Sequence, residues 1–184
     1  MLNFINRARW RKNAMVIAVL LMLSLMASSF SATAIEPKKR DLQWAYMMNF
    51  IRYFSWPEQP HMTVNFCIIG RNPFSLDQGD FSSKQKDGKI TAVKYHETLP
   101  SVEVMNRCQV IYFSSSITMA QLSFVFSKLG SLPIVTIADH QGFIKIGGIL
   151  QFTEKNNKLR FRLNKAVLNT MNLKIHPALL RLSD

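Results

Sequence analysis

Apolar side chains recur at intervals of three and four residues over residues 36–56. The positions are Leu42, Ala45, Phe50, Tyr53 and Phe54. This period is typical of an amphipathic helix, and Pro57 is expected to end it. The first turn of this helix holds Lys38, Lys39 and Arg40. Positive charge is disfavoured there by the helix dipole, so these residues are either solvated or the mark of a frayed start.

Short apolar runs bounded by turn residues make up the middle of the chain and predict strands. They cover residues 64–69, 90–95, 108–113 and 134–137. The run 64–69 is apolar up to Gly70, as in a buried parallel strand, whereas 90–95 alternates and resembles an edge strand. The spacing of the runs suits crossovers between parallel strands. The polar stretch 82–88 is predicted to be a loop.

A further helix is predicted to end at Leu129, with Gly130 as its C-cap. Its N-cap is assigned to the run Ser114-Ser115-Ser116, because serine side chains accept hydrogen bonds from the first free N–H groups of a helix. Residues 102–107 are interpreted as a short helix or loop that leads into the strand at 108–113.

Residues 147–152 and 158–163 predict a hairpin, because Asn156-Asn157 between them tolerates the positive φ of a tight turn. In its second strand three residues are expected in the core and two outside: Leu159, Phe161 and Leu163 against Arg160 and Arg162. Short helices are predicted at 165–171 and 178–182. The whole pattern predicts a three-layer α/β fold, with a mixed, mainly parallel central sheet flanked by helices and a C-terminal antiparallel hairpin.

The first 34 residues have the three regions of a secretory signal peptide. Residues 1–13 hold four basic residues and no acid, residues 14–26 are apolar apart from Ser24, and Ala32-Thr33-Ala34 fits a signal-peptidase site. The apolar stretch is shorter than the roughly 20 residues of a spanning helix, which favours cleavage over an uncleaved anchor. We expect residues 1–34 to be removed and residues 35–184 to form a single domain.

The composition is that of a globular chain, with 48% hydrophobic and 18% charged residues. The full chain has a formal net charge of +12, and loss of the four basic residues of the signal peptide leaves +8. For an exported protein the available acidic partners are lipid surfaces, cell-wall polymers and acidic protein faces, and not nucleic acid; a diffuse surplus of this kind usually serves solubility.

Cys67 and Cys108 are the only two cysteines. An exported chain meets an oxidising compartment, and two thiols allow one intramolecular pairing. Each cysteine lies in or beside an apolar run, so neighbouring strands would place the sulfur atoms for a bridge. We predict a structural disulfide; two buried free thiols are the alternative. A redox-active pair is not favoured, because the sequence has no C-x-x-C.

The sequence contains no G-x-S-x-G, P-loop, H-E-x-x-H or G-x-G-x-x-G motif, and its four histidines lack metal-ligand spacing. We therefore predict no enzyme activity, no metal and no cofactor. Asp139-His140 and Gly147-Gly148 could line a ligand site in loops after strands. Ordinary loop polarity and a strand bend are the simpler interpretations.

The basic and leucine-bearing C-terminal third is the predicted protein-contact surface. The candidate contact residues are Arg160, Arg162, Leu168, Leu173, Leu179 and Leu182. Core packing is the alternative role of these leucines. Trp56, at the end of the first predicted helix, is either a packing residue or a binding anchor, and we favour packing.

Short motifs follow one another in order over nearly the whole mature chain. They are Ala45-Tyr46, Asn49-Phe50, Tyr53 and Trp56-Pro57; Phe66-Cys67-Ile68-Ile69-Gly70 with Asn72-Pro73-Phe74; Cys108-Gln109-Val110-Ile111-Tyr112; Thr136-Ile137-Ala138-Asp139; Phe143 with Gly147-Gly148; Phe161-Arg162-Leu163-Asn164; and Leu179-Leu180-Arg181-Leu182. No single motif is specific, but the ordered set resembles the YfiR-like periplasmic proteins.

This resemblance implies a regulator and not an enzyme. The best-known members bind the periplasmic sensor domain of an inner-membrane diguanylate cyclase and hold the cyclase inactive, which lowers cyclic di-GMP and biofilm formation. An outer-membrane lipoprotein can sequester them. For this chain the resemblance implies a periplasmic location and these two kinds of partner, and it leaves a homodimer open.

The family's cysteine pair matches Cys67 and Cys108. Some relatives carry a second pair near the Gly-Gly segment, where Ile146, Gly147 and Phe152 stand in this chain, so redox sensing through a second bridge is in doubt. The alternative function is a periplasmic small-ligand-binding sensory domain that uses the loops around Asp139-His140 and Gly147-Gly148.

Overall fold

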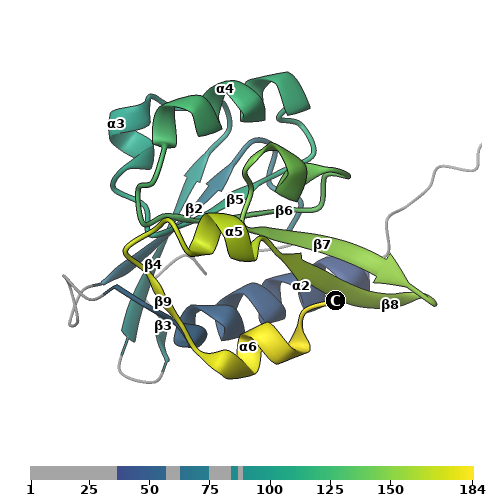
Figure 1. Cartoon of the computed structure of the whole chain (residues 1–184). Coiled ribbons are helices and arrows are strands. Elements are labelled where there is room, and N and C mark those ends of the chain that lie inside the picture. The colour runs from purple at the N-terminus through teal and green to yellow at the C-terminus, as the bar shows by residue number, and fades with distance from the viewer. Residues whose placement is uncertain (1–36, 57–62, 75–83, 87–88) are drawn as a thin grey trace, which may run out of the picture. The chain divides into compact units, whose positions relative to one another are not determined.

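A seven-stranded mixed sheet organises the chain (Figure 1). The computed structural model describes residues 37–56, 63–74, 84–86 and 89–184, so the predicted signal peptide and Pro57 lie outside the described residues. The strands are β2 (Val64–Ile69), β3 (Lys84–Lys86), β4 (Lys89–His96), β5 (Val110–Phe113), β6 (Val135–Ala138), β7 (Leu150–Lys155) and β8 (Lys158–Leu163). Their order is β3-β4-β2-β5-β6-β7-β8; the five inner strands are parallel, and β3 and β8 are antiparallel to their neighbours.

Helices cover both faces of this sheet, which confirms the predicted three-layer α/β fold with a mainly parallel sheet and a C-terminal hairpin (Figure 1). α3 (Val102–Met105) and α4 (Met119–Leu129) lie on one face, and α2 (Pro37–Phe50) and α6 (Pro177–Leu182) lie on the other. The 3-10 helices η2 (Ile51–Tyr53) and η4 (Phe143–Ile146) and the short helix α5 (Lys165–Leu168) connect these elements. Within the described ranges, no helix combines the length and the apolar character needed to cross a bilayer.

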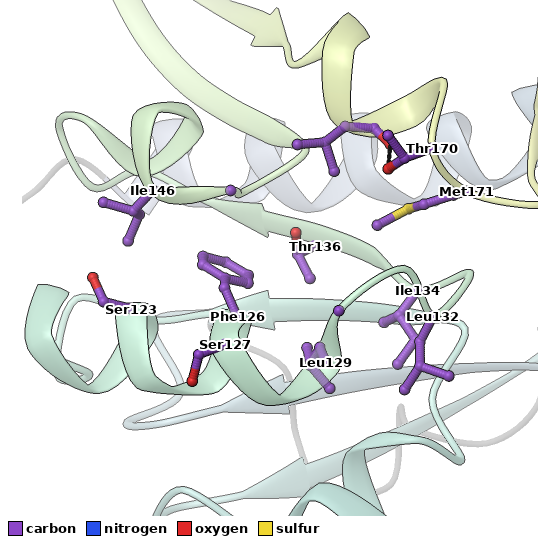
Figure 2. Close-up of a pocket in the computed structure, with 13 residues that line it drawn as sticks. Ser123, Phe126, Ser127, Leu129, Leu132, Ile134, Thr136, Ile146, Thr170 and Met171 are labelled. Atoms are coloured by element: carbon purple, nitrogen blue, oxygen red, sulfur yellow. Dashed lines mark hydrogen bonds between the residues drawn. The ribbon is translucent and has the colours of Figure 1, made fainter.

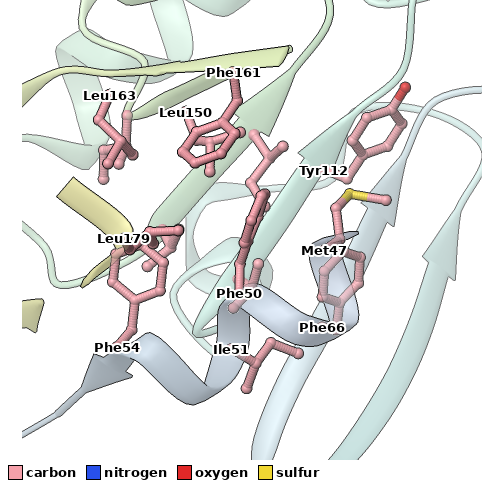
Figure 3. Close-up of a cluster of buried hydrophobic side chains, with 14 of the residues drawn as sticks. Met47, Phe50, Ile51, Phe54, Phe66, Tyr112, Leu150, Phe161, Leu163 and Leu179 are labelled. Atoms are coloured by element: carbon pink, nitrogen blue, oxygen red, sulfur yellow. The ribbon is translucent and has the colours of Figure 1, made fainter. Parts of the chain in front are cut away.

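The period-two alternation of the strands divides the buried side chains into two cores. On β2, Phe66 and Ile68 face α2, whereas Cys67 and Ile69 face α3 and α4. The core under α2 is rich in aromatic rings (Figure 3). Its centre is Phe50, whose ring lies 4.7 Å from that of Phe161 on β8. This contact packs α2 against β8, which is the last strand of the sheet in chain order.

The extent and the buried face of α2 differ from the prediction. Leu42 and Ala45 are exposed, while Gln43, Met47 and Phe50 are buried. Gln43 is compatible with burial because its side-chain oxygen accepts a hydrogen bond from Arg40. The apolar spacing is therefore confirmed at Phe50 and Phe54 but wrong at Leu42 and Ala45, because it does not count the buried polar Gln43.

The predicted helix over 36–56 is also too long at its C-terminal end. After η2, Phe54–Ser55 forms β1, which pairs antiparallel with β9 (Lys174–Ile175). The strand that pairs with β1 lies far along the chain, so local periodicity gives no information on this pairing. Trp56 is buried and donates a hydrogen bond from Nε1 to the Pro133 carbonyl at 2.7 Å, which confirms the packing interpretation.

The N-cap of α4 is Thr118 and not the serine run. The Thr118 hydroxyl accepts from the backbone N–H of Gln121, and the Gln121 side chain accepts from the backbone N–H of Thr118, so the two form a capping box. Ser114 and Ser116 instead line the turn after β5, where a Cβ on Gly70 would lie 2.5 Å from each hydroxyl oxygen. Gly130 does end the helix, with φ 55°.

Two other predicted segments need correction. The stretch predicted as a loop over 82–88 contains β3, which pairs with β4 and thereby removes the predicted edge from β4. A strand of lysine and glutamine has no hydrophobic alternation by which to recognise it. The helix predicted over 165–171 ends at Leu168.

The C-terminal hairpin is confirmed, but its first strand, β7, covers Leu150–Lys155 instead of the predicted 147–152. Asn156 and Asn157 have φ values of 52° and 56°, as a tight turn with a right-handed twist requires. The predicted alternation on β8 is also confirmed: Leu159, Phe161 and Leu163 are buried, and Arg160 and Arg162 are exposed.

Candidate functional site

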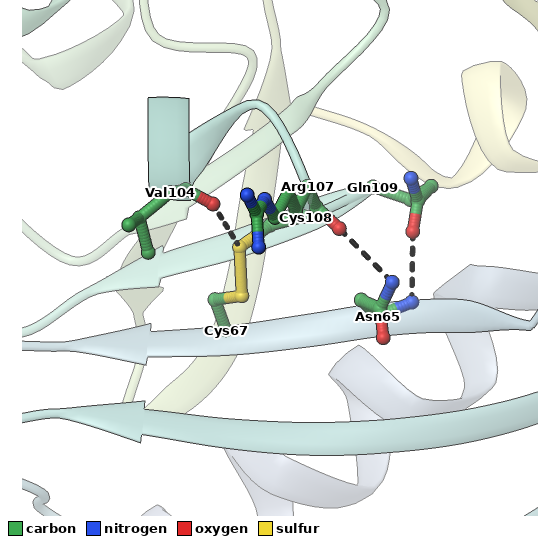
Figure 4. Close-up of a disulfide and its surroundings, with 6 residues drawn as sticks. All are labelled: Asn65, Cys67, Val104, Arg107, Cys108 and Gln109. Carbon is green, nitrogen blue, oxygen red and sulfur yellow. Dashed lines mark hydrogen bonds between the residues drawn. A yellow bond between two sulfur atoms is a disulfide. The ribbon is translucent and has the colours of Figure 1, made fainter. Parts of the chain in front are cut away.

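Cys67 and Cys108 form a disulfide at the start of the parallel pair β2–β5, which confirms the predicted bridge and excludes free thiols (Figure 4). Their Cα atoms are 5.9 Å apart, and both residues are buried. The Cys108 sulfur lies 3.7 Å from the Val104 carbonyl, which is a contact without a hydrogen bond because a bridged sulfur carries no proton. The bridge ties the turn after α3 to the centre of the sheet.

The same turn is fastened to β2 by Asn65 (Figure 4). The Asn65 side-chain amide donates to the Arg107 carbonyl at 2.9 Å, and its backbone N–H donates to the Gln109 side-chain oxygen at 2.9 Å. The Gln109 backbone N–H donates back to the Asn65 carbonyl at 3.0 Å. The disulfide therefore lies in a segment that hydrogen bonds already hold in register, as expected of a structural bridge.

Arg40 joins the first turn of α2 to the carboxyl end of β6. Its guanidinium lies 2.7 Å from the Asp139 carboxylate, 2.9 Å from the Gln43 side-chain oxygen and 3.4 Å from the Tyr112 hydroxyl. The Arg40 and Asp139 side chains are 12% and 23% exposed, so water screens this ion pair only in part. The basic first turn is therefore neither simply solvated nor frayed at Arg40.

Burial raises the pKa of the Tyr112 hydroxyl, and the nearby Asp139 carboxylate raises it further, against a smaller opposing effect of Arg40. The folded chain thus keeps this phenol protonated at pH values where the unfolded chain has lost the proton. The contribution of the Tyr112 hydroxyl to the free energy of unfolding is therefore fully present below the ordinary tyrosine pKa near 10. It falls as the pH rises above that value.

Unfolding measured from pH 9 to pH 11 should show this loss, with a contribution of up to about 1.4 kcal/mol per pH unit above pH 10. Tyr112→Phe should remove that contribution, because phenylalanine has no proton to lose. Tyr95→Phe, at an exposed ring, is the chemical control. Equal slopes in all three proteins would show that Tyr112 does not titrate differently on folding.

The other polar residues predicted after strands do not meet in one site. His140 Nε2 lies 2.7 Å from the Ile117 carbonyl, and Asp139 is engaged by Arg40. A side chain at position 148 would clash with the Phe143 ring, so glycine is the residue that fits there. Gly147, with φ 108°, is the one of these four that lines a groove. Within the described residues, His, Cys, Asp and Glu form no group of three that could hold a metal ion.

That groove runs between α4, β6, η4 and the turn after α5, and its volume is about 460 Å³ (Figure 2). Its lining is mainly apolar, with hydroxyl groups in the walls. The lining residues are Ser123, Phe126, Ser127, Leu129, Gly130, Leu132, Ile134, Thr136, Ile146, Gly147, Val167, Thr170 and Met171. The Thr136 hydroxyl at the floor accepts a hydrogen bond from the Ile149 N–H, so the floor is satisfied without a ligand.

The predicted contact residues of the C-terminal third separate into two groups. Leu168, Leu173 and Leu179 are 4%, 8% and 0% exposed, so they belong to the core under α2 and are not available to a partner of the folded chain. Their burial therefore corrects the prediction that these three leucines contact a partner. Arg160 and Arg162 on β8 are exposed, and Leu182 on α6 is 62% exposed, so these three stay candidates.

Sequence reasoning missed Phe124 on α4, which is 61% exposed. Leu122, Val125 and Leu129 form the buried side of this helix, and Phe124 falls outside that stripe. A helical projection of residues 119–129 would therefore have identified it as an outward-facing aromatic residue.

A protein-family model described as YfiR/HmsC-like matches residues 40–184. No curated protein matches the chain. The matched range begins at Arg40, spans the disulfide and the groove, and ends with the last residue of the sequence.

Proposed function

Because this chain belongs to the YfiR/HmsC-like family, we propose that it is a periplasmic regulatory protein that represses an inner-membrane diguanylate cyclase. It binds the periplasmic sensor domain of the cyclase and lowers cyclic di-GMP and biofilm formation. The observation that carries the proposal is the family match over residues 40–184. The disulfide agrees with an oxidising compartment such as the periplasm.

Repression by contact requires the regulator to bind the inactive form of its target more tightly than the active form. Moving the target from 1:99 to 99:1 in favour of the inactive form takes an affinity ratio of about ten thousand. A typical interface of about 800 Å² per partner with a few apolar anchors suffices for specific, stable binding. Arg160, Arg162 and Leu182 are proposed contacts on this basis, since all three are exposed.

The direct test is purification of the tagged chain from membranes after mild cross-linking, followed by identification of the bound proteins. We expect a membrane protein with a cytoplasmic diguanylate cyclase domain, and an outer-membrane lipoprotein as a competing partner. A tagged periplasmic protein of similar charge is the control. Recovery of neither partner would contradict the proposal.

The groove favours one alternative, a periplasmic sensory domain that binds a small ligand. Its volume of about 460 Å³ is in the range of small-molecule sites. A ligand that binds only the folded chain raises its thermal midpoint, by an amount that corresponds to about 2.7 kcal/mol at a hundred times the dissociation constant. Thermal-shift screening of the mature chain, with Ser127→Trp as a filled-groove control, distinguishes this alternative from a function that needs no ligand.

A further inference from the structure

Positive charge lies on the elements that form the walls of the groove. Three exposed lysines stand on the elements that form its walls: Lys128 on α4, Lys145 in η4 and Lys165 at the start of α5. The lining segments 119–138, 143–147 and 165–171 contain no aspartate or glutamate. The segments that line this mainly apolar groove therefore carry positive charge and no negative charge.

A large apolar side chain lies beside the groove but outside it. Phe124 is 61% exposed, and the Lys128 ammonium lies 5.6 Å from the centre of its ring. Its exposed neighbours on α4 are the small residues Ala120, Ser123 and Ser127 and the longer residues Gln121 and Lys128. Ser123 and Ser127 are also part of the groove wall (Figure 2), so helix positions next to Phe124 line the groove.

The groove and the Phe124 ring together distinguish a small-molecule occupant from a protein segment. A small molecule held in the groove would leave the Phe124 ring in water, whereas a protein segment that crosses α4 covers both, and aromatic residues are enriched in protein interfaces. In a symmetric dimer, a second copy of the chain would bring the same lysines against this surface. Charge complementarity therefore favours a different, acidic partner.

We propose that the groove and Phe124 form the docking surface for an acidic segment of a protein partner. The segment inserts an apolar side chain between α4 and η4 and places carboxylates near Lys128, Lys145 and Lys165. This inference rests on the proposed function, since it adds to the proposed contacts Arg160, Arg162 and Leu182 a further surface, and the partner chemistry, through which repression acts.

Two groove variants and two matched controls test it in a strain that lacks the chromosomal gene. Ser127→Trp places a large ring in the groove lining, and Lys145→Glu reverses a charge on η4; Asn106→Trp and Lys94→Glu introduce the same two residue types at exposed positions elsewhere. We expect both groove variants to bind the partner at least about tenfold more weakly and to lose repression, as for loss of a central contact. The controls should repress like the wild type, and all four should keep its thermal midpoint.

Photo-cross-linking through p-benzoylphenylalanine at position 124 gives a second, independent result. We expect an adduct with another exported or membrane protein at a peptide of net negative charge, and its loss in both groove variants. An adduct with a second copy of this chain, or no adduct, would overturn the inference. So would groove variants that repress like the wild type in a strain where deletion raises cyclic di-GMP, and that result leaves the proposed function intact. If deletion changes nothing, the proposed function fails and the cross-link alone decides the surface.

Discussion

Replacing both Cys67 and Cys108 by alanine should lower the free energy of unfolding by about 4 kcal/mol. The bridge joins residues 41 positions apart, and closing a loop of that length removes about this much entropy from the unfolded chain. Stabilities of small domains are about 5–15 kcal/mol, so the loss leaves the variant close to unfolding at 37 °C. Chemical denaturation of the mature chain, oxidised and after reduction, measures the same difference without a substitution.

The hydrogen bonds of Asn65 provide the matched control. Asn65→Ala removes the side-chain bond to the Arg107 carbonyl in the same turn but leaves the disulfide in place, so it should cost only about 1 kcal/mol. A double-alanine variant that loses less than Asn65→Ala would show that hydrogen bonds, and not the bridge, hold β5 to β2.

Arg40→Met should destabilise the chain by about 3 kcal/mol, because it leaves the Asp139 carboxylate without its cation in a site that is only 23% exposed. Removing one partner of a buried ion pair costs 3–5 kcal/mol, and the partial exposure here places the expectation at the lower end. The variant also releases the Gln43 oxygen and the Tyr112 hydroxyl from the guanidinium. Denaturant unfolding at pH 7 measures the difference.

Lys39→Met is the control, because Lys39 also pairs with a carboxylate, that of Glu154, but both side chains are exposed by 39% and 48%. An exposed pair of this kind contributes less than about 1 kcal/mol. Adding Asp139→Asn to Arg40→Met should recover part of the loss, since the amide is neutral. Equal losses of unfolding free energy in Arg40→Met and Lys39→Met would contradict the stabilising role assigned to the contact of Arg40 with Asp139.

The sequence was informative wherever local pattern determines structure. Continuous apolar runs identified β2, β5 and β6, and Asn156-Asn157 identified the hairpin turn. The disulfide followed from the compartment and the cysteine count. The strands and the turn depend on a few consecutive residues, and two cysteines allow only one intramolecular pairing.

Long-range pairing and polar burial were not accessible from the sequence. The pairing of Phe54 with Ile175 joins segments that no local period connects, and Gln43 is buried only because Arg40 satisfies its side chain. The same limit affected the candidate contact surface. Leu168 and Leu182 have the same residue type, but one is in the core and the other is exposed, which depends on the packing of α5 and α6.

The central claim is that this chain acts outside the cytoplasm by lowering the output of a diguanylate cyclase. The most direct measurement is the cellular concentration of cyclic di-GMP in a strain without the gene, complemented with either the full chain or residues 35–184 alone. We predict a rise on deletion, restoration by the full chain and no restoration by the form that lacks the predicted signal peptide. An unchanged concentration on deletion, or full restoration by the form without residues 1–34, would contradict the claim.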